Sequence, residues 1–329
     1  MLKLLSRIYS TAVLARNFAY DRGIIKVKKC GFPVISVGNL AAGGTGKTPA
    51  VIMIGKMLKK EGLLPAVVSR GYGRKSRGTF LFLPEDKPSP CQAGDEPVLI
   101  QRELGCPLCV SASRMEACAL LKEKGIRPDA VILDDGFQHR KIHRDLNILL
   151  LDSKKPSAGG LLPSGRLREP FDGIKRADLV IFTRHTGLPD SSRVEMVKKT
   201  SPEARVFFAS HETAGFFGID GIEKKAPESA SIFSAVASPD SFESSVRGQG
   251  IKIKNKLFLR DHSFLEGGVL KKLNDMLSEG PVVMTQKDAV KIPEKLSGSK
   301  NIYVLKIRFK IQNSSEFRNT VLEALNHSK

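Results

Sequence analysis

The stretch AAGGTGKTPA occupies residues 41–50 and follows an apolar run, FPVISVGN, at 32–39. Its ending, Gly-Lys-Thr at 46–48, matches the nucleotide-binding loop G-x-x-x-x-G-K-[ST], but Ala41 stands where the first glycine is expected. The remaining glycines let backbone N–H groups turn toward phosphate oxygens, which a β-carbon would obstruct. The altered position weakens the match to the pattern and leaves this chemistry in place. The stretch therefore predicts a phosphate-binding loop between a strand and a helix.

A helical pattern at 48–62 follows the loop directly and ends at Gly62. A helix that begins near Thr48 would add its positive N-terminal end to the phosphate site. In such loops the lysine reaches the transferring phosphate and the next hydroxyl binds Mg²⁺, so we assign these roles to Lys47 and Thr48. The residues predicted to bind the nucleotide are Ala41, Ala42, Gly43, Gly44, Thr45, Gly46, Lys47 and Thr48.

A second chemical signal is VILDDGFQH at 131–139. An apolar strand that ends in carboxylates is where nucleotide-hydrolysing and phosphate-transferring enzymes of this kind hold their metal ion. Successive strand residues point to opposite faces, so only one of Asp134 and Asp135 would face the metal directly if both remain extended. A simple strand-ending turn at Asp-Asp-Gly is the alternative.

Short apolar runs alternate with helical patterns over the first half of the chain, at 32–39, 64–73, 107–113, 129–136, 145–152 and 177–184. This alternation predicts an α/β fold whose parallel sheet is sandwiched by helices. Sites in such sheets lie at the carboxyl ends of the strands. The phosphate loop, the stretch 70–74, Asp134, Asp135 and Asp152 all fall at such ends.

The second half of the chain has a different organisation. The segment 204–219 is extended and looks like a connection, and strand-like runs at 231–238, 280–288 and 301–311 follow it. These runs predict a second, smaller α/β unit. We therefore expect a nucleotide-binding domain at 1–208 and a smaller C-terminal domain, with the extended linker, at 209–329.

Asp95 and His262 are further candidates for the chemistry. Asp95 lies in AGDEPVL at 93–99, where it could cap the following helix or accept a proton from a hydroxyl group. The sequence leaves both readings open. His262 lies in LRDHSF at 259–264, and a single histidine in such a context is more often structural than catalytic.

The composition restricts the partners. The 329 residues carry a formal net charge of +19, with a pI of about 9.8, which favours an anionic partner. Aromatic residues make up only 6% and tryptophan is absent, which argues against single-strand binding by base stacking. The five cysteines lack regular spacing, and the Cys106–Cys109 pair has no second pair for a zinc site, so we expect reduced thiols.

The N-terminal 23 residues have a helical pattern that Arg7 and Arg16 interrupt, so they do not form a membrane-spanning segment. On a helical wheel the apolar residues gather on one side: Leu4, Leu5, Ile8, Ala12, Ala15 and Ala19. A basic amphipathic helix of this kind can lie in the interface of an anionic bilayer. It can equally pack its apolar stripe against its own domain.

These motifs occur together in one known family. The chain resembles the tetraacyldisaccharide 4'-kinases, the lipid A 4'-kinases of Gram-negative bacteria. The resemblance covers nearly the whole chain. It rests on YDRG (20–23), VGNLAAGGTGKTP (37–49), SRGYGR (69–74), GDEP (94–97), LDDGFQHR (133–140), RDLNILLLD (144–152), LLPSGRLREP (161–170), DH (261–262) and TQKDAVK (285–291).

The resemblance implies transfer of the ATP γ-phosphate to the 4'-hydroxyl of tetraacyldisaccharide 1-phosphate, which yields lipid IVA. It implies ATP and Mg²⁺ as cofactors and a peripheral location on the cytoplasmic face of the bacterial inner membrane. An anionic membrane lipid as acceptor agrees with the basic composition and tips the N-terminal helix toward membrane docking. We expect a monomer that binds no nucleic acid.

The resemblance also implies residue roles. Asp95 would be the catalytic base, paired with His262 from the second domain, and Lys47 would serve the transferring phosphate. An aspartate held by a histidine would stay oriented and gain proton-accepting capacity. The implied metal-binding residues are Thr48, Asp134, Asp135 and Glu169. The implied substrate-binding residues are Arg70, Tyr72, Arg74, Gln138, His139 and Arg168.

The chain departs from the family pattern in its second half. Ser263 stands where many members have a second histidine, Gln286 where glutamate is usual, and 235–242 replaces a Gly-rich stretch. These departures leave the loop and Asp95 intact. The alternatives are a regulatory or delivery GTPase or ATPase of the same fold, and a nucleic-acid-binding NTPase suggested by the charge of +19.

Overall fold

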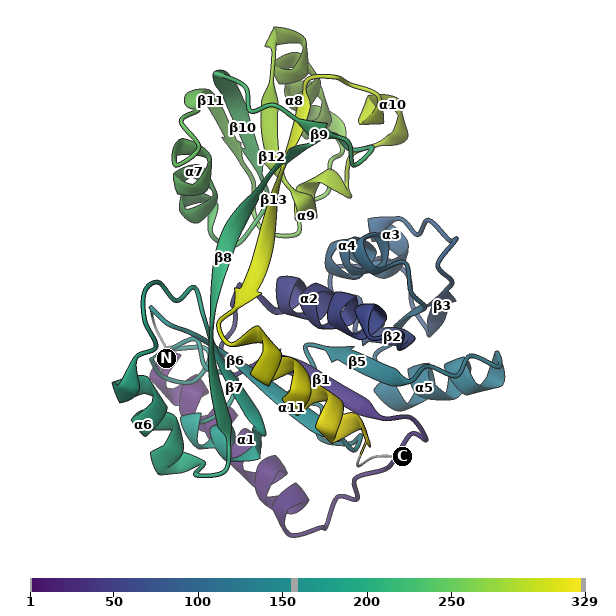
Figure 1. Ribbon diagram of the computed structural model, residues 1–329, viewed down its shortest axis with the longest axis vertical. Coiled ribbons are helices and arrows are strands. Elements are labelled where there is room, and N and C mark those ends of the chain that lie inside the picture. The colour runs from purple at the N-terminus through teal and green to yellow at the C-terminus, as the bar shows by residue number, and fades with distance from the viewer. Residues whose placement is uncertain (1, 155–158, 327–329) are drawn as a thin grey trace.

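A computed structural model describes residues 2–154 and 159–326 of the chain. It has two lobes that are joined by two long strands, β8 (Arg205–Phe217) and β13 (Ile302–Ile311) (Figure 1). One sheet of 13 strands runs through both lobes, in the order β11-β10-β12-β13-β8-β7-β6-β1-β5-β2-β4-β3, with β9 paired to β8. The larger lobe holds the phosphate loop, and the smaller lobe holds His262.

The strands of the larger lobe are parallel except for one edge strand, which confirms the predicted parallel sheet. Their bounds are β1 (Val34–Asn39), β2 (Pro65–Ser69), β3 (Phe80–Phe82), β4 (Leu108–Val110), β5 (Ala130–Asp134), β6 (Leu146–Asp152) and β7 (Leu179–Thr183). Only β3 runs antiparallel to its neighbour, β4. β1 lies between β5 and β6, so the loop that follows it stands beside the carboxyl ends of both neighbours.

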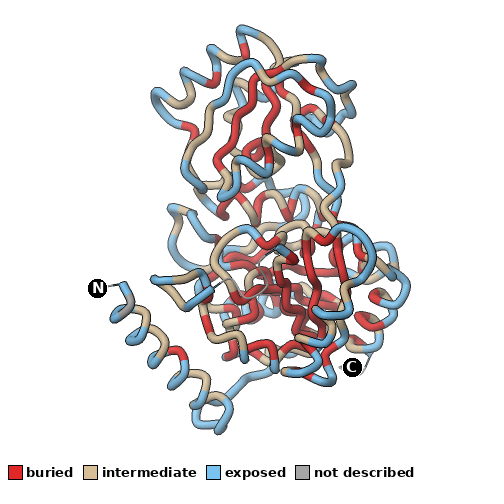
Figure 2. The backbone as a smooth tube through the Cα atoms, turned by 90° about the vertical axis from the view of Figure 1, so that its left-hand side faces the viewer, coloured by how far each residue is buried: buried red, intermediate tan, exposed pale blue. Residues whose placement is uncertain are grey.

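Helices cover both faces of this sheet. One face carries α2 (Lys47–Lys60), α4 (Asp95–Leu104) with the short α3 (Pro90–Ala93), and α11 (Ser314–Asn326); the other carries α5 (Arg114–Glu123), η1 (Phe171–Arg176) and α6 (Ser191–Thr200). Ile35 and Val37 of β1 pack toward α2, whereas Val34 packs toward α5. Because both strand faces are buried, the strands are apolar at nearly every position (Figure 2).

The segment predicted to be an extended connection is the strand β8. It pairs in parallel with β7 at its start and antiparallel with β13 along the rest, from Ala209 opposite Ile311 to Phe217 opposite Val304. After β13 the chain returns, and α11 packs Phe317 against the core of the larger lobe. The boundary predicted between residues 208 and 209 thus falls inside β8, and it remains a prediction.

The smaller lobe has its own sheet and its own core. Its other elements are β9 (Glu223–Lys224), β10 (Ser229–Ser234), α7 (Pro239–Arg247), β11 (Lys252–Phe258), α8 (Gly267–Glu279), β12 (Val282–Thr285), α9 (Gln286–Ala289) and α10 (Glu294–Ser297). Phe233 and Met284 pack toward α8, and Ile232 and Val283 pack toward α7. β11 was not predicted, because this exposed edge strand is rich in lysine and lacks the apolar pattern.

The N-terminal helix α1 (Leu2–Asp21) lies along the outside of the larger lobe (Figure 2). Most of its large apolar side chains point outward: Leu4 is 63% exposed, Ile8 61% and Phe18 55%, whereas Val13 is buried. The alternative in which this apolar stripe packs on its own domain is therefore wrong. Within residues 2–154 and 159–326, no helix combines the length and the apolar character that crossing a membrane would require.

Candidate active site

The phosphate loop connects β1 to α2. Gly46 adopts φ 85° directly before Lys47, the first residue of α2. A β-carbon at Gly46 would lie 2.7 Å from Nε2 of His211, which comes from β8, and one at Gly38 would lie 2.6 Å from Cβ of Phe137. Both positions therefore require glycine, because neighbouring groups fill the space that a side chain would need.

The structure explains why Ala41 can replace the first glycine of the motif. Ala41 forms an antiparallel bridge with Leu167, and the N–H of Ala42 donates to the carbonyl of Arg166 at 2.7 Å. Ala41 does not adopt a positive φ. The backbone is extended at this position, so an ordinary residue fits it.

Two arginines that the sequence analysis did not assign bind the outer side of the loop. The guanidinium of Arg166 donates to the carbonyl of Ala42 at 3.1 and 2.9 Å. Arg184 donates to the carbonyl of Gly44 and forms an ion pair with Asp152 at 3.0 Å. Arg166 lies in the quoted stretch LLPSGRLREP, but its bond to the phosphate loop and that of Arg184 were not predictable, because the loops after β6 and β7 meet the phosphate loop only in three dimensions.

Lys47 and Arg168 share one carboxylate. Nζ of Lys47 lies 3.6 Å from Oδ1 of Asp135, and NH1 of Arg168 donates to both oxygens of Asp135 at 2.8 and 2.7 Å. Burial raises the pKa of Asp135, but the charges of Lys47 and Arg168 outweigh it and hold this pKa below the usual range. Asp135 is therefore ionised at neutral pH.

Asp134 is the last residue of β5, and its environment is different. It is buried, and its Oδ2 accepts a hydrogen bond from Ser69 Oγ at 2.9 Å, whereas its Oδ1 has no hydrogen-bond partner. Burial, together with the charges of Glu96 and Asp135, raises the pKa of Asp134 to about 7. A buried carboxylate with a free oxygen is suited to bind a cation, which would lower this pKa again.

The carboxylates near the phosphate loop can bind Mg²⁺ only if a nucleotide supplies further oxygen ligands. Within the described ranges 2–154 and 159–326, no group of three or more His, Cys, Asp or Glu side chains could hold a metal by itself. Mg²⁺ commonly binds one or two carboxylates and completes its ligands with phosphate oxygens and water. Thr48, Asp134 and Asp135, the ligands predicted from the sequence, would be such an incomplete set.

Glu169 has a different environment from the other predicted metal ligands. It is fully buried, and its Oε1 accepts from Gln138 at 2.8 Å. Its Oε2 accepts from Arg176 at 2.6 Å and from Asn17 of α1 at 3.2 Å. Gln138 also donates to the carbonyl of Asn39, at the end of β1. Both carboxylate oxygens are thus engaged within the protein, as those of Asp135 are, so Glu169 positions Gln138 and its metal-binding role remains a prediction.

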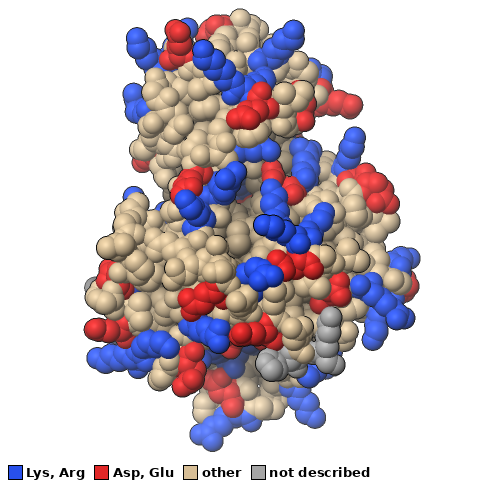
Figure 3. All heavy atoms as spheres, in the orientation of Figure 1, with Lys and Arg blue, Asp and Glu red and all other residues tan. Residues whose placement is uncertain are grey.

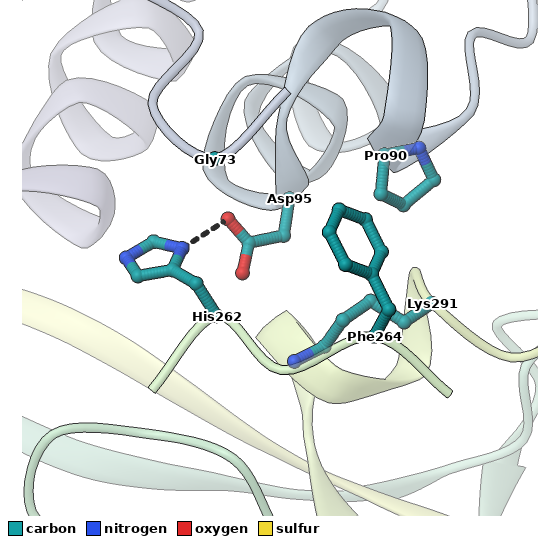
Figure 4. A pocket seen from close by; sticks show the side chains of 6 residues that line it. All are labelled: Gly73, Pro90, Asp95, His262, Phe264 and Lys291. Carbon is teal, nitrogen blue, oxygen red and sulfur yellow. Dashed lines mark hydrogen bonds and ion pairs between the residues drawn. The ribbon is translucent and has the colours of Figure 1, made fainter. Parts of the chain in front are cut away.

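Asp95 meets His262 across the two lobes (Figure 4). Asp95 is the first residue of α4, and its Oδ1 lies 2.9 Å from Nδ1 of His262. The turn before it needs Gly94, which has φ 93° and whose β-carbon would lie 2.8 Å from the carbonyl of Tyr72. Oδ1 also accepts from the N–H of Glu96 at 3.0 Å, so Asp95 bonds to the start of its own helix as well.

Burial raises the pKa of Asp95, but His262 and Lys287 outweigh it, and the resulting pKa lies below the usual range. The pairing therefore keeps the carboxylate ionised and oriented. The expectation that pairing increases its proton-accepting capacity is wrong for this arrangement, because a lowered pKa means a weaker base.

Lys287 was quoted in the sequence analysis only as part of a motif, and it lies at the centre of the contact between lobes. Its Nζ is 2.9 Å from Glu96, 3.0 Å from Asp261 and 3.8 Å from Asp95. It also lies 3.2 Å from Nε2 of His262. Burial lowers the pKa of Lys287, but the three carboxylates outweigh this and raise it. One ammonium group thus offsets part of the negative charge of three carboxylates.

The structure brings only some of the predicted substrate residues to this site. Tyr72 is 68% exposed and contacts His262 edge to face, with ring centroids 5.0 Å apart. Arg70 is exposed at the end of β2. Arg74 bonds instead to the carbonyls of Gly78 at 2.6 Å and Val110 at 3.4 Å, which stabilises its own loop.

His139 follows Gln138 in the loop after β5. Burial, with the charges of Arg114 and Arg144, lowers the pKa of His139 to about 4, so the ring is neutral at pH 7. Cys106 and Cys109 are buried near β4, and burial raises the pKa of both thiols to about 12. These thiols are therefore part of the core, in agreement with the reading of this stretch as a strand.

The parallel sheet, the phosphate loop, the carboxylates that end the neighbouring strand and the Asp95–His262 pair together define a phosphate-transferring enzyme of the P-loop class. Among known proteins, a family model described as tetraacyldisaccharide-1-P 4'-kinase (LpxK) matches residues 1–326. The chain belongs to this family.

Individual relatives agree with the family match. The tetraacyldisaccharide 4'-kinase of Geobacter metallireducens is 39% identical over 310 residues, which cover 90% of this chain and 89% of the relative. That of Elusimicrobium minutum is 35% identical over 334 residues, covering 96% and 88%. The crystal structure of LpxK from Aquifex aeolicus in complex with ATP superimposes with a TM-score of 0.79 at 32% identity, covering 98% of this chain and 97% of that one.

Proposed function

We propose that this protein is a lipid kinase that transfers the γ-phosphate of ATP to the 4'-hydroxyl of tetraacyldisaccharide 1-phosphate and so forms lipid IVA. The observation that carries the proposal is the Asp95–His262 pair, whose members come from different lobes and meet next to Glu96, whose charge acts on Asp134. A family member with this arrangement can bind the nucleotide on one lobe and close the other lobe over the acceptor.

Phosphoryl transfer requires positioning and charge neutralisation more than covalent chemistry. In our proposal the loop at 43–48 binds the phosphates, and Lys47 and Arg168 supply positive charge near the transferred group. Mg²⁺, held by Thr48, Asp134 and Asp135, would neutralise the phosphate oxygens. Glu169 keeps Gln138 beside the end of β1 and remains a predicted metal ligand.

Asp95 acts as the base in this proposal. It is ionised at neutral pH, and it would accept the proton of the sugar hydroxyl as the oxygen attacks the γ-phosphorus. His262 orients the carboxylate through its Nδ1. Glu96 follows Asp95 directly and lies near enough to Asp134 to raise its pKa, so the base is next to the proposed metal site.

We place the acceptor between the lobes. Lys and Arg side chains gather with Asp and Glu at the narrowing between them (Figure 3), which suits an acceptor that carries a phosphate group. Tyr72, which contacts His262, and the exposed Arg70 at the end of β2 are our candidates for acceptor contacts. Gln138, His139 and Arg74 remain predicted substrate residues.

We further propose that α1 docks on the cytoplasmic face of the inner membrane. The apolar side chains that α1 exposes would enter the interface, as expected for a peripheral helix. We also keep the sequence-based proposals of a nucleotide-binding domain at 1–208, a C-terminal domain at 209–329, a monomeric state and no nucleic-acid partner.

The test is phosphate transfer from radiolabelled ATP to a lipid A disaccharide 1-phosphate in detergent micelles with Mg²⁺. We expect a labelled lipid product and little release of free phosphate when the acceptor is omitted. Rapid hydrolysis without acceptor, and no labelled lipid, would contradict the proposal and favour a regulatory or delivery NTPase. The stretch TQKD at 285–288, which resembles a guanine-binding motif, gives that alternative no support, because Lys287 contacts Glu96 and Asp261.

A further inference from the structure

The helix α1 has an inverted amphipathic character. Its outward face is apolar, with Leu4, Ile8 and Phe18 more than half exposed. The face toward the protein contains the buried Val13 and polar groups that make hydrogen bonds to the larger lobe, among them Tyr9 and Asn17. A helix that served only as a membrane anchor would need no such specific polar contacts, so the inner face calls for its own explanation.

The inner face of α1 contacts the larger lobe at Arg140 and along residues 161–169, which we call the bridging segment. The hydroxyl of Tyr9 donates to the carbonyl of Arg168 at 2.7 Å, and Ser6 Oγ donates to the carbonyl of Leu161 at 2.9 Å. Nδ2 of Asn17 donates to Oε2 of Glu169 at 3.2 Å. Two of these three bonds are made to Arg168 and Glu169, whose side chains contact Asp135 and Gln138.

The opposite side of the bridging segment bonds to the phosphate loop. The N–H of Arg168 donates to the carbonyl of Leu40 at 2.7 Å, and the carbonyl of Arg166 accepts from the N–H of Ala42 at 2.7 Å. The peptide groups of Arg168 are thus held from both sides, by Leu40 through the N–H and by Tyr9 through the carbonyl. Its side chain then meets both oxygens of Asp135.

We propose that Tyr9 and Asn17 are positioning residues of the nucleotide and metal site: from the outer helix, they hold Arg168 against Asp135 and Glu169 against Gln138. This inference rests on the proposed kinase function for its relevance, but it concerns the binding of Mg²⁺ and ATP and can be tested without the lipid. The helix that exposes an apolar face to a membrane is in this way also a structural part of the site that binds the nucleotide.

The strength of these contacts sets the expected effect. A bidentate bond between a guanidinium and a carboxylate depends strongly on the orientation of both groups. When Tyr9 loses its hydroxyl, the carbonyl of Arg168 loses its bond to α1, and the guanidinium is less firmly oriented on Asp135. When Asn17 loses its amide, Oε2 of Glu169 keeps Arg176 but loses one of its two donors.

The experiment measures binding of a non-hydrolysable ATP analogue with Mg²⁺, by titration calorimetry in detergent and without lipid. We expect Tyr9→Phe and Asn17→Ala each to weaken this binding by about two- to tenfold, the effect of one lost hydrogen bond. Asn17→Asp should weaken it more than Asn17→Ala, because a carboxylate would face Glu169 instead of a donor. Co-sedimentation with anionic phospholipid vesicles and KM for the lipid acceptor should stay at the wild-type values.

Thr11→Val is the matched control. Thr11 lies on an exposed part of the same helix, and its hydroxyl bonds only locally, to the carbonyl of Arg7 at 3.1 Å. This variant should keep both nucleotide affinity and vesicle binding. A comparable loss in Thr11→Val would mean that any hydroxyl change in α1 has the effect, and this would overturn the inference.

Unchanged nucleotide affinity in Tyr9→Phe and in both Asn17 variants would also overturn it, as would a loss of vesicle binding alone. Thermal unfolding shows which variants are folded. If Tyr9→Phe is unfolded, the inference is decided by whether nucleotide affinity falls from the wild type to Asn17→Ala and further to Asn17→Asp. Wild-type enzyme that binds the analogue but labels no lipid would refute the proposed function and leave the positioning inference to be judged by the affinities.

Discussion

Nδ1 of His262 lies 2.9 Å from Oδ1 of Asp95, although 167 residues separate them in the chain. His262 adopts φ 62°, a left-handed conformation that costs free energy for a residue with a β-carbon. The surrounding contacts with Lys287 and Tyr72 hold it there. Such strain at a contact between two lobes is typical of a functional position.

The first prediction concerns this pair. Asp95→Asn keeps the shape of the side chain but removes the proton acceptor, so kcat should fall by about 10²- to 10⁴-fold. His262→Gln should cost less, because the carboxylate remains and loses only its orientation. The measurement is the initial rate of lipid phosphorylation at saturating ATP and acceptor.

The double variant checks that the two residues act together. His262→Gln should have little further effect in the Asp95→Asn background, since a residue that acts through Asp95 has nothing left to orient. Multiplicative losses would instead mean that His262 contributes independently. Nucleotide binding should be unchanged in all three variants.

The second prediction concerns Lys287, whose ammonium compensates Glu96, Asp261 and Asp95. Lys287→Met should raise the pKa of Asp95, because a positive charge that stabilises the ionised form is lost. The base must be ionised, so the acidic limb of the pH–rate profile should move to higher pH.

The profile of kcat/KM against pH provides the measurement for Lys287→Met. Lys256→Met is a suitable control, because Lys256 pairs with Glu243 in the same lobe and not with Asp95. An acidic limb that stays in place, with only a lower plateau, would contradict the assigned electrostatic role. A shift in the control would point to a general effect of charge.

The third prediction concerns the outer face of α1. Leu4→Ser combined with Ile8→Ser should lower binding to anionic phospholipid vesicles by about ten- to a hundredfold, because two exposed apolar side chains can no longer enter the bilayer interface. Sedimentation with vesicles measures the bound fraction. Leu64→Ser, at a position 66% exposed elsewhere on the larger lobe, should bind like the wild type. Equal binding of all three proteins would remove the proposed docking face.

The fourth prediction concerns stability in acid. Burial, with the charge of Arg184, lowers the pKa of His211 to about 4, and its Nε2 has no hydrogen-bond partner. The unfolded chain therefore binds a proton first as the pH falls below about 6.5, and folding stability decreases from there down to about pH 4. The shift from 6.5 to about 4 corresponds to at most about 3 kcal/mol.

Urea unfolding at pH 7 and pH 4.5 measures this effect. His211→Phe should lose less stability between the two pH values than the wild type, since phenylalanine does not titrate. Ile222→Ser is the control, because Ile222 is 66% exposed and carries no titratable group, so this variant should lose as much stability as the wild type between the two pH values. The same loss in His211→Phe as in the wild type would assign the acid sensitivity to other groups.

Several features were predictable because they depend on neighbours in the chain. The phosphate loop, the strand that ends at Asp134 and the helix that begins after Gly46 are each encoded in a few consecutive residues. Strands buried on both faces must be apolar throughout, so the parallel sheet was also visible in the sequence. The edge strand β11 has no such requirement and was missed.

Other features depended on contacts between distant parts of the chain. The sequence suggested a link between Asp95 and His262 only through a family resemblance, and it gave no sign that Lys287 lies between the carboxylates. Arg166 and Arg184 reach the carbonyls of the phosphate loop from the loops that follow β6 and β7. Periodicity records which faces are buried, but not which side chains meet there.

By itself, the sequence determined the kind of sheet, the place of the phosphate loop along it and the amphipathic pattern of the first helix. Only the tertiary structure decided that the apolar stripe of α1 faces outward while Tyr9 and Asn17 bind the bridging segment. The physical reason is that a helix forms through hydrogen bonds between residues close in the chain, so its own sequence can encode it. Which face turns inward depends on the groups that the rest of the fold presents to it.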